Sequence, residues 1–331
     1  MVTLNDIRQA QERLRGIAVR TPLLEFRIHE GRLPSDSDKL YLKLENLQPI
    51  GAFKLRGAYN KIASLTAAEL KRGVITYSSG NHAQGVAYAA RALGAKAVVV
   101  MPGNAPSGKR DATAALGAEL VLVGPSSLER QQKAEELASH YGYIVIPPYN
   151  DELIIAGQGT MGLEILEDLP QVESVLVPVG GGGMISGIAS AIKLSNPAVQ
   201  VIGVEPELAA DAQASFRSGK LVEFPAEDVC RTAADGLRTQ SLGPITFEHI
   251  RCYVDDIVTV SEYEITQAMR VLASDSRTVA EPSGTVAVAA FLFHRSDLPP
   301  TSINVAVISG GNIEQRLLQK IKQEATPAAS Y

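Results

Sequence analysis

Residues 174–187 read Ser-Val-Leu-Val-Pro-Val-Gly-Gly-Gly-Gly-Met-Ile-Ser-Gly. The first part is a continuous apolar run rich in β-branched residues, which is typical of a strand buried on both faces of a parallel sheet. Four successive glycines follow, and a helical pattern begins near Met184. A strand, a glycine loop and a helix in this order predict an α/β unit. Its flexible loop and the positive end of its helix can surround an oxyanion such as a phosphate.

The same alternation of apolar strand and helix recurs along the chain. We expect strands at residues 74–77, 97–101, 119–123, 201–204 and 304–308, each followed by a helical pattern. This order indicates the α/β class, with parallel sheets covered by helices on both faces. Residues 73–146 are expected to form a small domain, and residues 1–72 with 147–331 a larger one. A ligand should lie between them, at the carboxyl ends of strands.

Composition excludes several classes of protein. The chain has 331 residues, 45% of them hydrophobic, and a net charge of −5, so no basic field attracts nucleic acid or acidic lipid. Its two cysteines, Cys230 and Cys252, form no framework of paired spacings, which suits a reducing compartment. The start of the chain has no apolar core of a signal peptide, and proline and glycines interrupt the longest uncharged run, residues 174–192. We expect a cytoplasmic protein without a nucleic-acid or membrane partner.

One lysine has a setting that suits covalent chemistry. Lys54 lies in Gly51-Ala-Phe-Lys-Leu-Arg-Gly57, between Phe53 and Leu55. Apolar neighbours can desolvate an amine, which lowers its pKa and leaves it neutral for Schiff-base formation. Taken alone, the stretch fits a solvated lysine near a turn equally well or better.

Two further loops follow predicted strands. Ser78-Ser-Gly-Asn-His82 leads from a strand into a helix, where backbone N–H groups and short polar side chains can receive an anionic group. An ordinary helix N-cap is the alternative. Ser309-Gly-Gly-Asn312 follows the last strand, and a hydroxyl there can hydrogen-bond a ring nitrogen. A plain Gly-Gly turn is the alternative for this loop.

An acidic stretch offers oxygen ligands. Glu205-Pro-Glu-Leu-Ala-Ala-Asp211 places two carboxylates around a backbone carbonyl, at a spacing that suits Mg²⁺ or Ca²⁺. A solvated acidic helix start is the simpler interpretation of this stretch alone.

A dinucleotide site is a different interpretation of the glycine loop. Gly180 and Gly182 follow a strand, and Glu205 ends the next strand about where a ribose-binding acid belongs. However, Ile185 stands where the third glycine of that fingerprint should fall, and the loop lies in the middle of the chain. An NAD-dependent dehydrogenase would also have no use for Lys54, so we consider this class the less favoured one.

Taken together, these motifs resemble fold-type II pyridoxal-phosphate enzymes, in the branch of serine/threonine dehydratases and serine racemases. The resemblance runs in order over nearly the whole chain. It is carried by Arg20-Thr-Pro-Leu23, Gly51 to Gly57, Ser78 to Gln84, Ala156-Gly-Gln-Gly-Thr160, Gly180 to Gly183, Val204-Glu-Pro206, Ala234-Asp-Gly236, Glu281-Pro282 and Ser309 to Asn312. The fold that it implies is a two-lobed α/β structure like that of the tryptophan synthase β subunit.

The resemblance also implies a role for each matching residue. Lys54 would bind pyridoxal 5'-phosphate as a Schiff base and later act as the base at the substrate Cα. Asn81 would bond the phenolic oxygen of the cofactor ring, and Ser309 would meet its pyridine nitrogen. The other cofactor contacts would come from Phe53, Gly180, Gly181, Gly182, Gly183 and Met184. The substrate carboxylate and pocket would be formed by Ser78, Ser79, Asn81, His82 and Gly236. A divalent cation would be bound by Glu205, the carbonyl of Ala209, and Asp211.

The implied reaction is elimination of water and ammonia from a hydroxy amino acid such as L-threonine or L-serine, by a homodimer. Because Ser309 leaves the pyridine nitrogen unprotonated, the cofactor is a weaker electron sink, which favours quick loss of a β-hydroxyl. Ser79 keeps an amino-acid racemase with side dehydratase activity open. Ile50-Gly-Ala52 departs from the usual Thr-Gly-Ser before Phe-Lys. Related enzymes carry other residues at the position of Tyr149. Together these differences extend the candidate substrates to bulkier 3-hydroxy amino acids.

Overall fold

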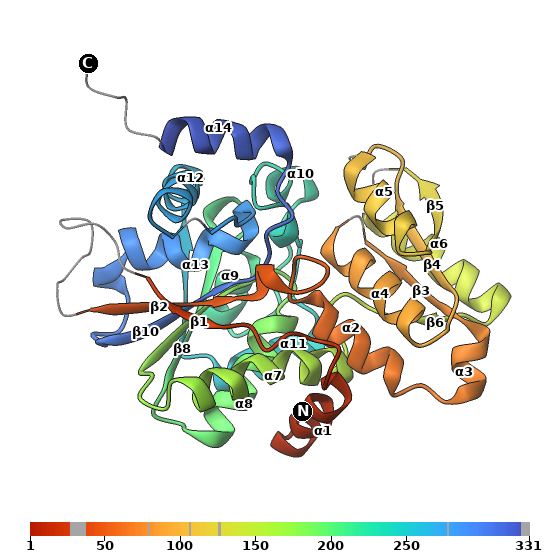
Figure 1. The fold of residues 1–331 in the computed structure, drawn as a ribbon, viewed down its shortest axis with the longest axis horizontal. Coiled ribbons are helices and arrows are strands. Elements are labelled where there is room, and N and C mark those ends of the chain that lie inside the picture. Colours follow the sequence, from red (N-terminus) through yellow and green to blue (C-terminus); the bar gives the residue numbers. More distant parts are fainter. Residues whose placement is uncertain (27–37, 79, 106, 125–126, 277, 326–331) are drawn as a thin grey trace.

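The structure, a computed structural model, describes residues 1–26, 38–78, 80–105, 107–124, 127–276 and 278–325. Its strands form two sheets that occupy separate parts of the molecule, the smaller one on the right of Figure 1. Most strands are parallel to their neighbours and alternate with helices, so the predicted α/β class is confirmed.

The larger sheet has the strand order β1-β2-β10-β7-β8-β9. Its strands are β1 (Leu23–Glu25), β2 (Lys39–Leu44), β7 (Ser174–Pro178), β8 (Gln200–Pro206), β9 (Asp256–Val260) and β10 (Ile303–Ile308). All neighbours are parallel except β1, which pairs antiparallel with β2 at the edge. The predicted parallel sheet is confirmed, with β1 as an antiparallel strand at its edge. A short antiparallel strand needs no crossover helix and can end a sheet whose interior is parallel.

Helices cover both faces of this sheet because successive strand residues point to opposite sides. Leu176 and Ala306 pack on the face covered by α12 (Glu262–Val271) and α13 (Pro282–Phe293). Val175 and Val305 pack on the other face, against α8 (Gly183–Ser195) and α11 (Pro244–Tyr253). Both sets of side chains are fully buried, which explains why the strands read as continuous apolar runs.

The smaller sheet has the strand order β5-β4-β3-β6 and is parallel throughout. Its strands are β3 (Val74–Tyr77), β4 (Ala97–Pro102), β5 (Glu119–Val123) and β6 (Ile144–Val145). One face packs on α4 (Asn81–Ala92) and on α2 (Lys54–Ala63), the other on α6 (Ser127–Tyr141). The helix that begins at the proposed cofactor lysine thus packs against the smaller sheet. The predicted domain boundaries, 73–146 against the rest, remain a prediction.

The remaining helices complete the two layers. They are α1 (Leu4–Leu14), α3 (Ala67–Arg72), α5 (Ser107–Ala115), α7 (Glu152–Asp168), α9 (Asp211–Ser218), α10 (Ala226–Val229) and α14 (Gln315–Ala325). Short turns of other helix types lie at Glu45–Leu47 (η1), Glu207–Ala209 (η2), Asp235–Leu237 (η3), Leu272–Ser276 (η4) and Arg295–Asp297 (η5). In the part of the chain that the structure describes, no helix is long and apolar enough to cross a membrane. The uncharged run 174–192 is β7, the glycine loop and most of α8.

Candidate active site

Two loops from opposite ends of the sequence are joined by backbone hydrogen bonds. The Phe53 N–H donates to the Ser309 carbonyl at 3.0 Å, and the Gly311 N–H donates to the Gly51 carbonyl at 2.9 Å. Ala52 and Gly310 form an antiparallel bridge between these bonds. The segment before Lys54 and the segment after β10 therefore form one unit, as expected if both contact the same ligand.

Lys54 is the first residue of α2, and its amine lies inside the site. Its Nζ donates to the Pro148 carbonyl at 2.7 Å and lies 5.1 Å from the centre of the Phe53 ring. The side chain as a whole is half-buried, but protein surrounds the amine, and this desolvation lowers the pKa of Lys54 to about 8. A substantial fraction of the amine is therefore neutral and nucleophilic at physiological pH.

The glycine loop after β7 has the features of a phosphate cradle. Within the described residues, the amide N–H groups of residues 180–184 donate to no acceptor, and the last of them lie in the first turn of α8. Gly182 has a φ of +87°, a left-handed conformation that favours glycine and turns the chain into the helix. Unsatisfied amides at a helix N-terminus suit an anionic group, so the loop fits the phosphate of the cofactor.

Tyr149 packs directly on this loop. A Cβ at Gly181 would collide with the Tyr149 ring, and a Cβ at Gly183 would come within 2.9 Å of the Tyr149 Cβ. Burial raises the pKa of Tyr149 to about 12, and the nearby charges of Tyr77 and Asp211 act in the same direction. Tyr149 is thus a neutral aromatic wall beside the glycine loop, consistent with its predicted place near the cofactor.

Asn81, the first residue of α4, is held by two other side chains. Its Nδ2 donates to Glu281 Oε1 at 2.6 Å, and its Oδ1 accepts from Asn312 Nδ2 at 2.7 Å. Glu281 is 3% exposed, and burial followed by the charge of Asp235 raises its pKa to about 7. Asn81 therefore joins the Ser78–His82 loop to the loop after β10.

The rest of the Ser78–His82 loop is only partly described. Ser78 is half-buried, and its Oγ accepts from the Gly80 N–H at 3.3 Å. Ser79, the predicted racemisation residue, lies outside the described residues. The His82 ring contacts the Ile146 carbonyl through Nε2 at 3.0 Å, and burial lowers its pKa to about 3. The His82 side chain is thus a neutral group bound to the residue that follows β6, and only its backbone is available to an anion at the helix start.

Ser309 and Gly236 lie on the larger-sheet side of the site. The Ser309 side chain is buried directly after β10, and its Oγ has a long contact of 3.4 Å with the Ser283 carbonyl. Such a weakly bonded hydroxyl is free to turn toward a ring nitrogen. The Gly236 N–H donates to Ser283 Oγ at 2.8 Å, and the backbone carbonyl of Gly236 lies beside Gly180. Gly236 is thereby positioned next to the glycine loop, as predicted for a pocket residue.

Glu205 lies close enough to Asp211 for their charges to interact, and Ala209 precedes Asp211 by two residues. Glu205 is the next-to-last residue of β8 and accepts the N–H groups of Ala212 and Gln213 at 3.0 and 2.7 Å. Both Asp211 carboxylate oxygens are buried without a hydrogen-bond partner. Burial, with the neighbouring Asp211 charge, raises the pKa of Glu205 well above its usual range, and burial raises that of Asp211 to about 8.

This acidic pair fits a hard cation, although it is a small donor set. Among the described residues, no group of three or more His, Cys, Asp or Glu side chains is arranged to hold a metal ion. The predicted set has only two such side chains, and its third ligand is the Ala209 carbonyl. The orphaned Asp211 oxygens are nevertheless the donors that Mg²⁺ and Ca²⁺ prefer. Ala209 lies in η2, before α9 begins at Asp211.

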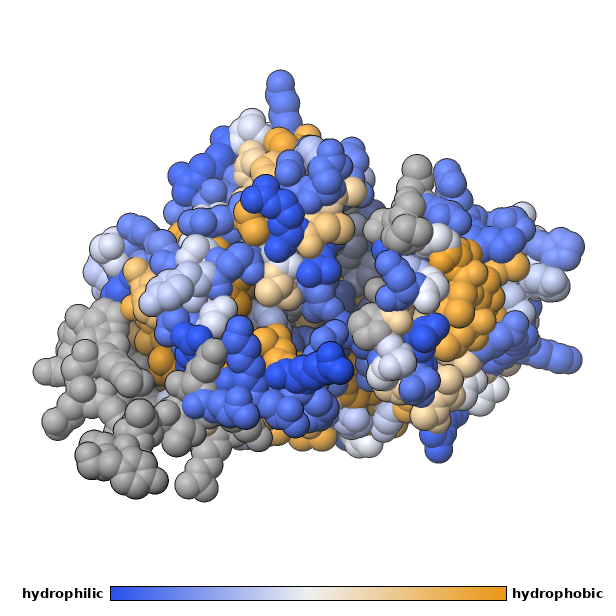
Figure 2. All heavy atoms as spheres, turned by 90° about the horizontal axis from the view of Figure 1, so that it is seen from above, coloured by the Kyte–Doolittle hydropathy of each residue, from blue (hydrophilic) through white to orange (hydrophobic). Residues whose placement is uncertain are grey.

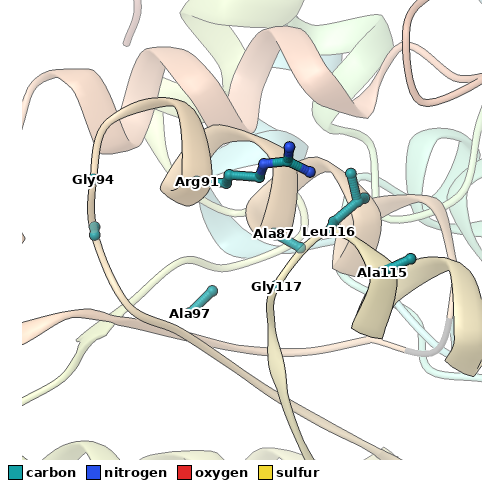
Figure 3. A pocket seen from close by; sticks show the side chains of 8 residues that line it. Ala87, Arg91, Gly94, Ala97, Ala115, Leu116 and Gly117 are labelled. Atoms are coloured by element: carbon teal, nitrogen blue, oxygen red, sulfur yellow. The ribbon is translucent and has the colours of Figure 1, made fainter.

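A surface cavity lies apart from the residues described above. This cavity, of about 350 Å³, is bordered by α4, α5 and the starts of β4 and β5, and Arg91 is its one charged side chain (Figure 3). It opens at the amino ends of the strands, whereas Ser78 and Asn81 follow the carboxyl end of β3. Between the larger part of the molecule and the smaller lobe, the surface is hollowed (Figure 2). The site residues come from both sides of this junction.

The fold and site define a pyridoxal-phosphate enzyme of fold type II. The family model described as "Pyridoxal-phosphate dependent enzyme" matches residues 14–310, and the chain belongs to this family. This membership excludes the dehydrogenase interpretation of the glycine loop.

Individual relatives place the chain within the family. L-threonine ammonia-lyase of Thermotoga maritima is 45% identical over 97% of this chain and 78% of the relative. L-threo-3-hydroxyaspartate ammonia-lyase of Saccharomyces cerevisiae is 40% identical over 95% of this chain and 94% of the relative. The solved structure of maize serine racemase superimposes with a TM-score of 0.91 at 34% identity, covering 98% of this chain and 97% of the other. The predicted branch, dehydratases and serine racemases, is confirmed.

The structure also reveals contacts that the sequence did not predict. Glu281 was recognised only as part of the resemblance, with no role, and it contacts Asn81. Asn312 was only the last residue of a turn motif, and it contacts the same amide. Pro148 was seen as a hinge, but its carbonyl accepts from Lys54. Each contact joins residues at least 94 positions apart, and no local pattern indicates such pairs.

Proposed function

We propose that this protein is a pyridoxal-phosphate-dependent ammonia-lyase that converts L-threonine or L-serine to a 2-keto acid and ammonia. The observation that carries the proposal is the Lys54 amine, which has a pKa of about 8 and lies in the same site as the Gly180–Gly183 loop and Ser309. The 45% identity to a threonine ammonia-lyase supports the choice of reaction.

The residues of the site support this reaction in the following way. When bound, the cofactor supplies an electron sink for cleavage of the substrate Cα–H bond. Lys54 binds the cofactor and takes the Cα proton, the glycine loop binds the phosphate, and Ser309 hydrogen-bonds the ring nitrogen. The backbone at the start of α4, including that of Asn81, orients the substrate carboxylate. Phe53 and Tyr149 exclude water from the ring.

Two other activities should be tested alongside the dehydration of L-threonine and L-serine. The similarity to L-threo-3-hydroxyaspartate ammonia-lyase, together with Ile50 and Ala52 before the lysine, supports a dehydratase with a different side-chain pocket. The similarity to maize serine racemase, and a serine at position 79, support racemisation as a second activity. Both activities would use the same lysine and the same glycine loop.

The spectrum of the purified protein tests the cofactor site. We expect a yellow protein whose visible band is bleached by borohydride, as a lysine Schiff base is. Lys54→Ala should lack the band. Lys61→Ala, on the same helix in an ion pair with Asp151, should keep it. No band in the wild type after incubation with pyridoxal phosphate would refute the proposal.

Product analysis tests the reaction. The holoenzyme is incubated with L-threonine, L-serine and L-threo-3-hydroxyaspartate, and 2-keto acid, ammonia and D-amino acid are measured. We expect keto acid and ammonia in equal amounts from at least one substrate. A D-enantiomer without keto acid would identify a racemase instead, and neither product from any hydroxy amino acid would exclude both activities.

We also propose that Glu205, the Ala209 carbonyl and Asp211 bind Mg²⁺ or Ca²⁺. The support is the buried acidic pair, whose Asp211 oxygens have no protein partner. The predicted homodimer and cytoplasmic location remain predictions. Sedimentation of the purified protein and fractionation of the source cells would test them.

A further inference from the structure

The Asn81 side chain is oriented by partners of opposite polarity. Its Nδ2 donates to Glu281 Oε1 at 2.6 Å, and its Oδ1 accepts from Asn312 Nδ2 at 2.7 Å. A second Asn312 Nδ2 hydrogen goes to the Ile50 carbonyl at 2.9 Å, so this amide is itself fixed. If the Asn81 amide turned over, its oxygen would face a carboxylate and its nitrogen would face another amide nitrogen. Both contacts would then be repulsive, so only one orientation fits.

Two glycines make room for these partners. A Cβ at Gly310 would collide with Glu281 Oε1 and lie 3.1 Å from Asn81 Nδ2. A Cβ at Gly51 would lie 2.5 Å from Asn312 Oδ1, and Gly51 also has a φ of +72°. The glycines on either side of the joined loops therefore permit the arrangement Glu281–Asn81–Asn312, which we call the amide clamp.

The clamp leaves one donor of Asn81 free. An Asn amide has two N–H hydrogens, and Glu281 takes one of the two on Asn81. The remaining hydrogen is the only donor that the fixed side chain can offer to a ligand. A donor aimed at a charged oxygen favours the charged form of that oxygen.

We propose that Glu281 and Asn312 are positioning residues that hold the Asn81 amide so that its free Nδ2 hydrogen donates to the phenolic oxygen of the cofactor. This inference rests on the proposed function and goes beyond it, because it assigns a task to two residues that touch the cofactor only through Asn81. With the clamp intact, the phenolic oxygen is charged and the proton lies on the Schiff-base nitrogen, the form that absorbs visible light. Without the clamp, the proton moves to the oxygen and absorbance moves to the near ultraviolet.

Asn312→Asp is the sharpest variant because it changes one donor into an acceptor with almost no change in shape. The new carboxylate repels Asn81 Oδ1, so the two partners no longer favour one orientation and the amide can turn. We expect the ratio of visible to near-ultraviolet absorbance of the holoenzyme to fall about tenfold, because losing a hydrogen bond to a charged group typically shifts a protonation equilibrium by about that factor. Asn196→Asp is the matched control, since Asn196 is also half-buried and uses only its oxygen, which accepts the Ala198 N–H. It should leave the ratio unchanged.

Glu281→Ala separates the clamp from a plain charge effect. It removes negative charge, whereas Asn312→Asp adds it, so a charge effect would move the two spectra in opposite directions. The clamp predicts a fall in the ratio for both, measured above the Glu281 pKa of about 7. Glu281→Gln keeps an acceptor oxygen and should restore the ratio to within about twofold of the wild type. If Asn312→Asp does not hold the cofactor, this pair of Glu281 variants provides the decisive measurement.

A double-variant cycle shows whether the effect passes through Asn81. In an Asn81→Ala background, Asn312→Asp should change the ratio less than about twofold, because the amide that it turns is gone. An unchanged spectrum in Asn312→Asp holoenzyme, opposite shifts in the two single variants, or equal shifts with and without Asn81 would overturn the inference. Absence of the band in the wild type would instead refute the proposed function.

Discussion

Two buried groups of charged residues are built on opposite principles. In the first, Lys43, Glu45, Arg56 and Glu164 are all nearly inaccessible to solvent and connect β2, η1, α2 and α7. Arg56 donates to both Glu45 oxygens and to both Glu164 oxygens at 2.6–2.8 Å, and Lys43 donates to Glu164 at 2.6 Å. In the second, Glu205 and Asp211 lie together, and no side-chain cation among the described residues is paired with them.

The difference teaches how this fold treats buried charge. The first group has two cations and two anions, so its net charge is zero, and Arg56 holds the pKa of Glu45 below its usual range despite burial. The second has two anions, and burial raises the pKa of both. A buried carboxylate stays charged when its counter-charge belongs to the chain. Where the counter-charge is missing, a cation from solution is expected to supply it.

Removing one member of the first, charge-neutral group should have the largest effect on the free energy of unfolding. Arg56→Met leaves Glu45 and Glu164 buried without their main partner, and removing one member of a buried ion pair costs about 3–5 kcal/mol. We expect this loss in the free energy of unfolding, measured by urea denaturation of the cofactor-free protein. A loss below about 1 kcal/mol would mean that water reaches the two carboxylates when the arginine is absent.

Removing one carboxylate of the Glu205–Asp211 pair should have a smaller effect on the free energy of unfolding, and of opposite sign. At a pH above the Asp211 pKa of about 8, Asp211→Asn removes a buried negative charge, so in the presence of chelator we expect unfolding to cost about 1–3 kcal/mol more than in the wild type. Saturating Mg²⁺ or Ca²⁺ should raise wild-type stability, by about 2.7 kcal/mol at a hundred times the dissociation constant, but not that of the variant.

The control for this pair is Asp228→Asn, which alters an exposed side chain and should change neither result. A wild type that is indifferent to both cations, with an Asp211→Asn variant less stable than the wild type, would contradict the cation site.

An exposed cluster gives the smallest expected effect and sharpens the first comparison. Arg20 pairs with Glu167 and Asp168, but its side chain is 48% exposed. Arg20→Met is the same substitution as at position 56, and it should cost less than about 1 kcal/mol because water replaces the lost partners. A cost similar to that of Arg56→Met would show that burial is not what separates the two arginines.

The alternation of elements was predictable from the sequence, and the reason is burial. Strands β3 and β5 begin and end at the predicted residues, and β4, β7, β8 and β10 differ by one or two positions. Apart from the edge strand β5, whose residues are half-buried or exposed, these strands are buried along nearly their whole length, so their apolar runs are unbroken. The short edge strand β1 has half-buried and exposed residues, gives no such signal, and was not predicted.

The candidate site was predictable as a set of loops but not as an arrangement. The glycine loop, Lys54 and Ser309 each follow a strand or begin a helix, where local sequence reveals anion-binding and capping chemistry. The Lys54–Pro148 contact and the amide clamp depend on segments that meet only in the folded chain. The sequence could suggest the acidic pair at Glu205 and Asp211, but not that Asp211 would lack a partner.

The position of β10 in the larger sheet has a consequence for synthesis. It is the last strand of the chain, yet it lies between β2 and β7 in the middle of the sheet. The earlier strands cannot close the sheet before the ribosome has made residues 303–308, and Ser309 follows immediately. The cofactor lysine therefore lacks its completed site while residues 55–308 are being made. Because domains fold as their segments emerge, the smaller sheet can fold first, and cofactor capture is expected only after Ser309 has been made.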